Sequence, residues 1–374
     1  MPAVHLLIKP ASGMCNMRCD YCFYHDITKK REQSSYGFMS EETLRHVISR
    51  AFDYAEGNCS ITFQGGEPTL AGLDFFRKAI ELEKEYEAKY RQKHLQISNA
   101  IQTNGFNLTE EWARFFADNH FLVGISVDGT IHTHDACRRD SSGNGTFLSV
   151  MRTISLFDAC HVEYNILTVV NQKTASSIRK IYAYYKKMGF LYQQYIPCLD
   201  PFDVPSGSMP YSLTPVQYGK FLCELFDLWY DDFLHGRMVY IRQFENYVSI
   251  LLRGHAESCD MNGFCSIQNV VEADGEVYPC DFWVLDAYKL GNLNQVSFKE
   301  IEKRRQEIQF LERSHVVHET CKSCPYGSIC RGGCYRHRVM TDDQKNYFCE
   351  SFRTFFDICL PRLQHVARLV QRTF

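Results

Sequence analysis

The sequence has 374 residues, of which 41 are Lys or Arg and 44 are Asp or Glu, so its net charge is -3. With 45% hydrophobic and 23% charged residues it has a globular composition, which excludes a disordered chain and argues against a strongly basic nucleic-acid-binding protein. No run of about 18 apolar residues occurs and no export signal opens the chain, so we expect a cytoplasmic protein without a membrane span. The unusual count is 17 cysteines, which in a long chain of this kind indicates metal binding more than disulfides.

Strand-like and helix-like patterns alternate over roughly the first 200 residues, as in a parallel α/β sheet. Short β-branched runs predict strands at Val4–Ile8, Cys59–Gln64, Leu95–Gln102, Leu122–Val127, Tyr164–Val170 and Leu191–Pro197. Amphipathic spacing predicts helices between them at Ser40–Ala55, Leu73–Tyr90, Glu110–Asn119, Phe147–Cys160 and Ala175–Met188. Ser40 and Thr109, each followed by two glutamates, are expected to cap two of these helices. Six such units suit a partial (β/α)6 TIM-like barrel better than a complete one, with the chemistry at the carboxyl ends of the strands.

Beyond about residue 200 the sequence changes character and includes a second, loop-rich region. Residues 200–215 are rich in Pro, Ser and Gly and predict a connector, and helical patterns follow at Val216–Leu234 and Phe244–Leu252. The segment from Cys259 to Cys349 is loop-rich, and Phe352–Val370 has a helical pattern. We therefore expect a barrel over residues 1–235, a connector helix over 236–258, a second domain over 259–349 and a C-terminal helix over 350–374.

Three cysteines follow the first predicted strand closely: Cys15, Cys19 and Cys22. Three thiolates at this spacing on one loop can bind three irons of a 4Fe-4S cluster and leave the fourth iron open, as an incomplete ligand set leaves a catalytic zinc open. A structural zinc knuckle or a chance arrangement is the alternative. A second mark, Gly65-Gly66-Glu67-Pro68, directly follows the second predicted strand; its glycines allow close backbone approach, although alone it is also a plausible turn.

The C-x3-C-x2-C spacing, with Tyr21 before the third cysteine, resembles the radical S-adenosylmethionine (SAM) superfamily. In that family the open iron holds the amino and carboxylate groups of SAM. The loop Gly65–Pro68 matches a second mark of the family, where it can hydrogen-bond the amino group. The resemblance therefore implies a SAM-dependent radical enzyme with a catalytic 4Fe-4S cluster.

A second, denser group contains eight cysteines, and its spacing resembles the SPASM extension of radical enzymes that modify peptides. In those enzymes the extension binds two further 4Fe-4S clusters, whereas a zinc ribbon is the structural alternative. Family precedent assigns one cluster to Cys259, Cys265, Cys280 and Cys334 and the other to Cys321, Cys324, Cys330 and Cys349, a pairing that spacing alone cannot show. The remaining cysteines are expected to be mostly buried apolar residues, namely Cys59, Cys137, Cys160, Cys198, Cys223 and Cys359.

Further motifs resemble the anaerobic sulfatase-maturating enzymes nearly from end to end, and they include Leu7–Ser12, Thr62–Gly72, Gln102–Gly105, Val123–Gly129, Cys198–Pro201 and Tyr278–Phe282. Those enzymes oxidise a Cys or Ser side chain of a sulfatase precursor to Cα-formylglycine (3-oxoalanine) by way of a 5′-deoxyadenosyl radical. The resemblance implies that five residues surround SAM: Tyr21, Gly66, Ser126, Arg138 and Leu199. It makes Asp281 the proton acceptor, because a base must lie near the target thiol or hydroxyl. Gln64 and Tyr24 are candidates for orienting the peptide.

Two other functions stay open at this point. Another SPASM-type radical enzyme, for example one that forms thioether cross-links in a ribosomal peptide, would share every cluster ligand; however, the first cysteine at residue 15 leaves no room for an N-terminal leader-recognition domain. A zinc-stabilised binding module without catalysis would contain zinc and no iron. The maturase hypothesis implies a monomeric oxidoreductase with three 4Fe-4S clusters, a sulfatase precursor as substrate, and a reductant such as flavodoxin or ferredoxin.

Overall fold

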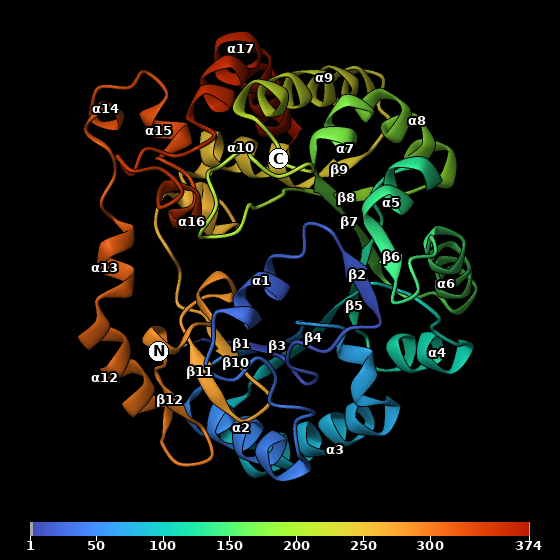
Figure 1. Cartoon of the computed structure of the whole chain (residues 1–374), viewed down its shortest axis with the longest axis vertical. Coiled ribbons are helices and arrows are strands. Elements are labelled where there is room, and N and C mark those ends of the chain that lie inside the picture. The colour runs from blue at the N-terminus through green and yellow to red at the C-terminus, as the bar shows by residue number, and fades with distance from the viewer. Residues whose placement is uncertain (1–2, 374) are drawn as a thin grey trace. The chain divides into compact units, whose positions relative to one another are not determined.

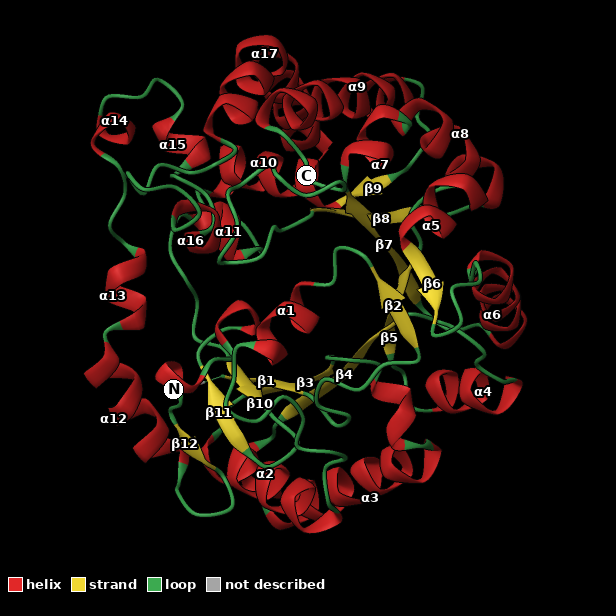
Figure 2. Ribbon diagram, viewed as in Figure 1, coloured by secondary structure: helices red, strands yellow, loops and turns green. Residues whose placement is uncertain are grey.

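The computed structural model describes residues 3–373, and these form two compact units whose segments alternate along the chain (Figure 1). The first unit holds the chain up to Ser126 together with Arg138–Tyr164 and Ile267–Phe310. The second holds Val127–Cys137, Asn165–Ser266 and the chain from Leu311 onward. Both units contain strands and helices (Figure 2), which confirms the predicted α/β class. Among the described residues, no helix is long and apolar enough to cross a membrane.

The sheet of the first unit has the strand order β12-β11-β10-β1-β3-β4-β5. These strands are β1 Val4–Ile8, β3 Asn58–Phe63, β4 Gln96–Thr103, β5 Leu122–Ser126, β10 Asn269–Val271, β11 Glu276–Tyr278 and β12 Gly291–Asn292. From β10 to β5 every neighbouring pair is parallel, whereas β11 and β12 are antiparallel additions at the β10 side. Strand β1 therefore has a partner on each side, β3 from nearby in the chain and β10 from the C-terminal third.

Helices cover the first unit's sheet and bury its apolar side chains. They are α1 Phe23–Lys29, α2 Glu41–Tyr54, α3 Leu73–Lys89, α4 Glu110–Asp118, α6 Phe147–Cys160 and α12 Phe298–Ile308. Figure 1 shows α2 and α3 on one side of β1, β3 and β4, and α1 on the other. Ser40 caps α2 as predicted, because its hydroxyl accepts a hydrogen bond from the Thr43 amide at 3.1 Å. Thr109 occupies the same position at α4, but its side chain makes no capping hydrogen bond.

The second unit contains three parallel strands and a helical layer. The strands are β7 Tyr164–Val170, β8 Tyr192–Pro197 and β9 Tyr240–Ile241, and the main helices are α8 Ile178–Met188, α9 Pro215–Leu234, α10 Arg242–Arg253 and α17 Cys349–Thr373. Phe244 of α10 stacks on Phe355 of α17 with 5.9 Å between ring centroids, and Phe226 of α9 meets Phe244 at 5.2 Å. These aromatic contacts form the apolar interior of this helical layer.

The long elements follow the predicted pattern, and the short ones do not. All six predicted strands are confirmed with ends that shift by one residue at most. The predicted helix Ala175–Met188 is instead two helices, α7 Gln172–Ser176 and α8, because the backbone of Ser177 leaves helical geometry between them. The three strands β10, β11 and β12 were not predicted, since two or three residues are too few to show a period. Within the described residues neither set of strands closes on itself, so the barrel is partial, as expected.

Candidate active site

Three neighbouring parallel strands end side by side and bring three polar residues to one edge of the sheet. The register pairs the last residue of β1 with the last residues of β3 and β10. The next residue of each strand is Lys9, Gln64 and Glu272, respectively, so all three lie at the carboxyl edge. In parallel sheets this edge is where binding and catalytic groups collect.

Asp281 lies at this edge and is held by two of these residues. Asp281 is the first residue of the short helix η3 Asp281–Trp283, which follows β11, and it is 9% exposed. The Lys9 ammonium donates to Oδ1 of Asp281, while the Gln64 amide donates to Oδ2 at 2.8 Å. Both carboxylate oxygens are therefore fixed by donors from two paired strands.

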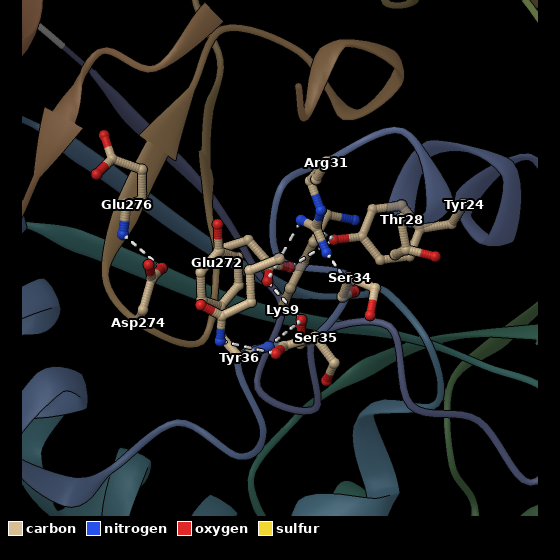
Figure 3. A network of polar contacts seen from close by, with 12 residues as sticks. Lys9, Tyr24, Thr28, Arg31, Ser34, Ser35, Tyr36, Glu272, Asp274 and Glu276 are labelled. Carbon is tan, nitrogen blue, oxygen red and sulfur yellow. Dashed lines mark hydrogen bonds and ion pairs between the residues drawn. The ribbon is translucent and has the colours of Figure 1, made fainter. Parts of the chain in front are cut away.

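Lys9 is enclosed by the Tyr24 ring on one side and by the Asp281 carboxylate on another. Figure 3 shows Lys9 and Tyr24 in one network of polar contacts. The Lys9 side chain is fully buried, and its Nζ lies 3.8 Å from the centroid of the Tyr24 ring, close enough for a cation–π contact. Tyr24, on α1, donates its hydroxyl to Oε1 of Glu272 at 2.5 Å. Burial, and after it the nearby Glu272 carboxylate, raises the pKa of Tyr24 well above its ordinary value. Tyr24 is thus a neutral phenol whose ring contacts the Lys9 ammonium.

Glu272 is a second carboxylate in the same network, and it is buried completely. It accepts a hydrogen bond from the Ser12 hydroxyl at 2.6 Å in addition to that from Tyr24. The Arg31 guanidinium lies 3.5 Å from it, so the buried negative charge has a cation of its own (Figure 3). Lys9 and Arg31 therefore balance Asp281 and Glu272, two charges against two.

The three cysteines of the first motif lie on the connection between β1 and α1. Cys15 and Cys22 are exposed, and Cys19 ends the short strand β2 Met17–Cys19. That strand pairs with β6 Arg138–Asp140, so that Arg138 lies opposite Cys19. The Arg138 guanidinium is 4.0 Å from the Cys19 sulfur and 5.5 Å from the centre of the Tyr21 ring. The structure thus brings two of the predicted SAM residues to the cysteine loop.

The Gly65–Pro68 segment also lies against the cysteine loop. Gly66 has φ +54°, and a Cβ there would lie 2.1 Å from the carbonyl oxygen of Met14, so only glycine fits. The Glu67 amide donates to the same oxygen at 2.8 Å. The buried Glu67 carboxylate accepts from the Asn104 amide at 2.7 Å, and the Asn104 side chain reaches the Cys15 sulfur at 3.7 Å. The segment therefore anchors two loops next to the cysteines.

The other predicted SAM residues lie in different places. Ser126 is the last residue of β5, at the carboxyl edge of the first unit's sheet. Leu199 belongs to the second unit, where it is buried just after β8. The next residue, Asp200, accepts from the Ser212 hydroxyl at 2.5 Å and from the Gly207 amide at 2.7 Å, which ties the segment after β8 to residues 207 and 212.

Four cysteines of the second group surround one cavity in the second unit: Cys321, Cys324, Cys330 and Cys349. Burial raises the pKa of Cys330 to about 12, so iron would have to displace a proton to bind there. Gly332, with φ +83°, bends the backbone beside the cavity, and Asn346 donates to its carbonyl at 3.0 Å. Within residues 3–373, no group of three or more His, Cys, Asp or Glu side chains converges closely enough to bind a single metal ion. An all-cysteine set around a cavity fits the ligand requirement of a 4Fe-4S cluster.

The remaining cysteines of that group divide between the units. Cys259, Cys265 and Cys334 belong to the second unit, where burial, and also the neighbouring Cys259 and Cys265, help raise the pKa of Cys334 to about 12. Cys280 belongs to the first unit and directly precedes Asp281.

Of the six cysteines outside the motifs, Cys59, Cys137, Cys198 and Cys359 are buried as predicted, whereas Cys160 and Cys223 are half-buried. The prediction that these cysteines are mostly buried is confirmed.

Two residues of the site were missed by sequence reasoning. Lys9 directly follows a correctly predicted strand, so its place at the carboxyl edge could have marked it. Glu272 follows β10, a strand of three residues that no period reveals. Tyr24 stays a candidate for orienting the peptide with Gln64, and the structure shows its contacts with Lys9, Arg31 and Glu272.

Comparison with known proteins defines the class first. The family described as the radical SAM superfamily matches residues 10–184, and the iron-sulfur cluster-binding domain SPASM matches residues 248–325. The chain is therefore a radical SAM enzyme with a SPASM domain. It is 46% identical over 374 residues to the cysteine-type anaerobic sulfatase-maturating enzyme of Clostridium perfringens, covering 99% of this chain and 100% of that one.

Other relatives agree. The cysteine-type enzyme of Clostridium novyi is 47% identical over 98% of both chains, and the serine-type enzyme of Bacteroides thetaiotaomicron is 31% identical over 98% of this chain and 91% of its own. The chain belongs to the family of anaerobic sulfatase-maturating enzymes.

Solved structures give the same picture. The structure "Native anSMEcpe with bound AdoMet" matches with a TM-score of 0.93 at 46% identity, over 98% of this chain and 100% of that chain. SuiB of Streptococcus suis, bound to its precursor peptide SuiA, matches with a TM-score of 0.60 at 14% identity over 93% of this chain and 75% of its own. At that identity the second match shows a shared fold alone.

Proposed function

We propose that this chain oxidises a cysteine side chain of a sulfatase precursor to Cα-formylglycine. The observation that carries the proposal is the position of Asp281, a carboxylate held at the carboxyl edge of the sheet by Lys9 and Gln64 and adjacent in sequence to Cys280. Support for a cysteine target comes from the relatives that are 46% and 47% identical over nearly the whole chain, both of which are cysteine-type enzymes.

Three 4Fe-4S clusters are part of this proposal. The proposed ligand sets are Cys15, Cys19 and Cys22; Cys259, Cys265, Cys280 and Cys334; and Cys321, Cys324, Cys330 and Cys349. When bound, SAM and the first cluster supply the radical that removes a hydrogen from Cβ of the target, and the two fully ligated clusters can accept an electron. A reductant of the flavodoxin or ferredoxin kind would provide the starting electron.

The proposed SAM site consists of residues at or near strand ends and beside the cysteine loop. They are Tyr21, Gly66, Ser126, Arg138 and Leu199. Arg138, whose guanidinium lies next to Cys19, would pair with the cofactor's carboxylate. Gly66 allows its backbone to lie against the cysteine loop, within reach of the proposed SAM site, because no Cβ stands between Gly66 and Met14.

Asp281 is the proposed proton acceptor. Removal of a Cβ hydrogen, loss of the thiol proton to a positioned carboxylate and transfer of one electron to a cluster leave a thioaldehyde, which water hydrolyses to the aldehyde with release of hydrogen sulfide. The two donors use one lone-pair direction on each oxygen, and the others remain available for the substrate. Gln64 is the proposed link to the peptide as well, since its amide oxygen is not used in the contact with Asp281.

The test is an anaerobic assay with a short peptide that has a Cys in a C-x-P-x-R context. Formylglycine should appear as a loss of mass, and 5′-deoxyadenosine should form alongside it. With Asp281→Asn we expect product to fall by about 10²–10⁴-fold, because the base is lost, while 5′-deoxyadenosine still forms.

Asp286→Asn is the matched control, because Asp286 lies in the next short helix, η4 Asp286–Tyr288, and pairs with Lys289 at 2.7 Å. It should leave both products unchanged. Cofactor cleavage with an unmodified peptide would overturn the proposal and favour another peptide substrate, such as one that receives a thioether cross-link. Conversion of only the matching Ser peptide would overturn the assignment to cysteine.

A further inference from the structure

Lys9 contacts the proposed base but lies too deep to meet a peptide directly. Its side chain has no exposed surface, and its ammonium touches the Asp281 carboxylate on one side and the Tyr24 ring at 3.8 Å on the other. We infer that Lys9 is a positioning residue: it fixes the Asp281 carboxylate in the orientation that receives the substrate proton. This inference rests on the proposed function of Asp281.

Stability alone gives no reason for a lysine at this position. Burying an ammonium is expensive, and a buried ion pair is often no more stable than apolar side chains of the same size. Yet the surrounding chain is built around this side chain. Gly65 has φ +110°, and a Cβ there would lie 2.7 Å from Cγ and 2.9 Å from Nζ of Lys9. The first glycine of the Gly65–Pro68 motif therefore leaves room for the lysine.

The orientation that results is well defined. Lys9 follows β1 and Gln64 follows β3, and every residue of β1 is paired with a residue of β3. The donors consequently have a fixed separation, and they hold Oδ1 and Oδ2 of Asp281 individually. With only Gln64 left, the carboxylate could rotate about its last bond, and its free lone pairs would no longer point in one direction.

Lys9 in turn cannot swing away from Asp281. Tyr24 blocks its other side, and the Tyr24 hydroxyl is tied to Glu272 at 2.5 Å. Glu272 already has Arg31 as its cation, at 3.5 Å. Lys9 is therefore the cation that serves Asp281, and its removal would leave that carboxylate, not Glu272, without a counter-ion.

The experiment compares Lys9→Met with Lys9→Arg in the iron-loaded enzyme on the cysteine peptide. In Lys9→Met we expect the rate constant for product to fall by about 10²-fold, the effect of a base misplaced by about 1 Å. The KM for the peptide and the rate of 5′-deoxyadenosine formation should stay close to the wild-type values, because the buried Lys9 side chain is not expected to contact the peptide or SAM. Lys9→Arg should recover part of the product rate, since it keeps the charge but changes the donor geometry.

Two controls separate positioning from folding. Lys93→Met removes a partly buried lysine of the same unit, one that donates to backbone carbonyls of Phe52 and Ala55 at 3.2 Å, and it should leave the ratio of product to 5′-deoxyadenosine unchanged. In an Asp281→Asn background, Lys9→Met should cause no further loss of product, because the residue through which it acts is already altered.

The outcomes also separate the two proposals. A wild-type enzyme that leaves the peptide unmodified overturns the proposed function and this inference with it. If the wild type works and Lys9→Met forms product at the same rate, the role of Lys9 is overturned and the proposed function stands. The same holds if the losses from Lys9→Met and Asp281→Asn multiply in the double variant. If Lys9→Met does not fold, Lys9→Arg is the test variant. The inference is overturned if Lys9→Arg has the wild-type product rate and the wild-type ratio of product to 5′-deoxyadenosine.

Discussion

At the scale of single residues, one short motif has three separate structural tasks. Gly65 leaves room for the side chain of Lys9, Gly66 allows the loop to lie against Met14, and the Glu67 carboxylate holds the loop after β4 through Thr103 and the Asn104 amide. A motif first attributed to contact with a cofactor therefore also contacts the lysine that holds Asp281, the proposed base, and the cysteine loop. Its residues are constrained even where they touch no ligand.

Gly66→Ala tests the second of these tasks. The new Cβ would collide with the Met14 carbonyl at 2.1 Å, and the backbone φ of +54° disfavours alanine as well. We expect the cysteine loop to shift, so that the iron content falls by about a third, from about 12 to about 8 per chain, and 5′-deoxyadenosine formation is lost. Iron analysis and a SAM-cleavage assay measure this.

Gly57→Ala is the control for strain, because Gly57 has φ +82° and open space around it. It should lower stability slightly and leave iron content intact. Equal iron loss in both variants would mean that backbone strain, and not the contact with Met14, is responsible.

At the scale of elements, prediction succeeded where a segment was long enough to show a period. The strand β1 and the helix α6 have the predicted bounds, because alternating or helical spacing repeats within them. The candidate site depends on β10, which has only three residues. It also depends on the contact between Lys9 and Asp281, two residues that are 272 positions apart in the sequence. Local spacing contains no information on such a pairing. The proposed role of Asp281 was therefore available by resemblance, whereas the contact with the Lys9 cation was not.

The contact between α3 and β4 gives a prediction on pH. Glu83 of α3 is 5% exposed, and burial raises its pKa from 4.5 to about 7, while a hydrogen bond from Asn99 opposes the shift. Since the folded state binds the proton more tightly than the unfolded state, stability should fall as pH rises from about 4.5 to 7 and then stay level. Glu83→Gln removes this loss. We expect it to be more stable than wild type at pH 8, by at most about 3 kcal/mol, and nearly equal to it at pH 4.5.

Two further atoms strengthen this expectation. Oε1 of Glu83 and Oδ1 of Asn99 are both buried acceptors without a donor, and a glutamine amide at position 83 could supply one. Thermal unfolding at the two pH values measures the effect, and Glu81→Gln on the exposed side of the same helix is the control. A stability difference of the same size at both pH values would refute the role assigned to the Glu83 carboxyl group.

At the scale of the whole molecule, the chain passes from one unit to the other and back. It leaves the second unit after Ser266, adds Ile267–Phe310 to the first, and enters the second again at Leu311. The segment in between contains β10, Cys280 and Asp281. The residues that complete the candidate site of the first unit therefore come from a stretch that lies, in sequence, between the cysteines of the second.

Removal of one ligand from the four-cysteine cavity tests how the clusters contribute to the whole protein. In Cys330→Ala we expect less iron than about 12 per chain, because the cavity loses one of its four thiolate ligands, and a lower midpoint of thermal unfolding, because cluster binding contributes to folding free energy. Cys160→Ala, a half-buried cysteine outside the motifs, should retain all of the iron. A protein that contains zinc and no iron would contradict the cluster assignment as a whole.

The parallel pairing of β1 with β10 has a consequence for synthesis. One edge of β1 is covered by residues 269–271, so in a growing chain that edge stays open from the time the first strand leaves the ribosome until these residues follow. At about 5–20 residues per second this interval is on the order of 10–50 s, and an uncovered strand edge can pair with other chains during that time. Interrupted translation before Asp281 would also leave Lys9 without its counter-ion. Chaperones that shield the nascent N-terminal strands should therefore increase the yield of folded protein, although β1 has a partner on both sides in the finished fold.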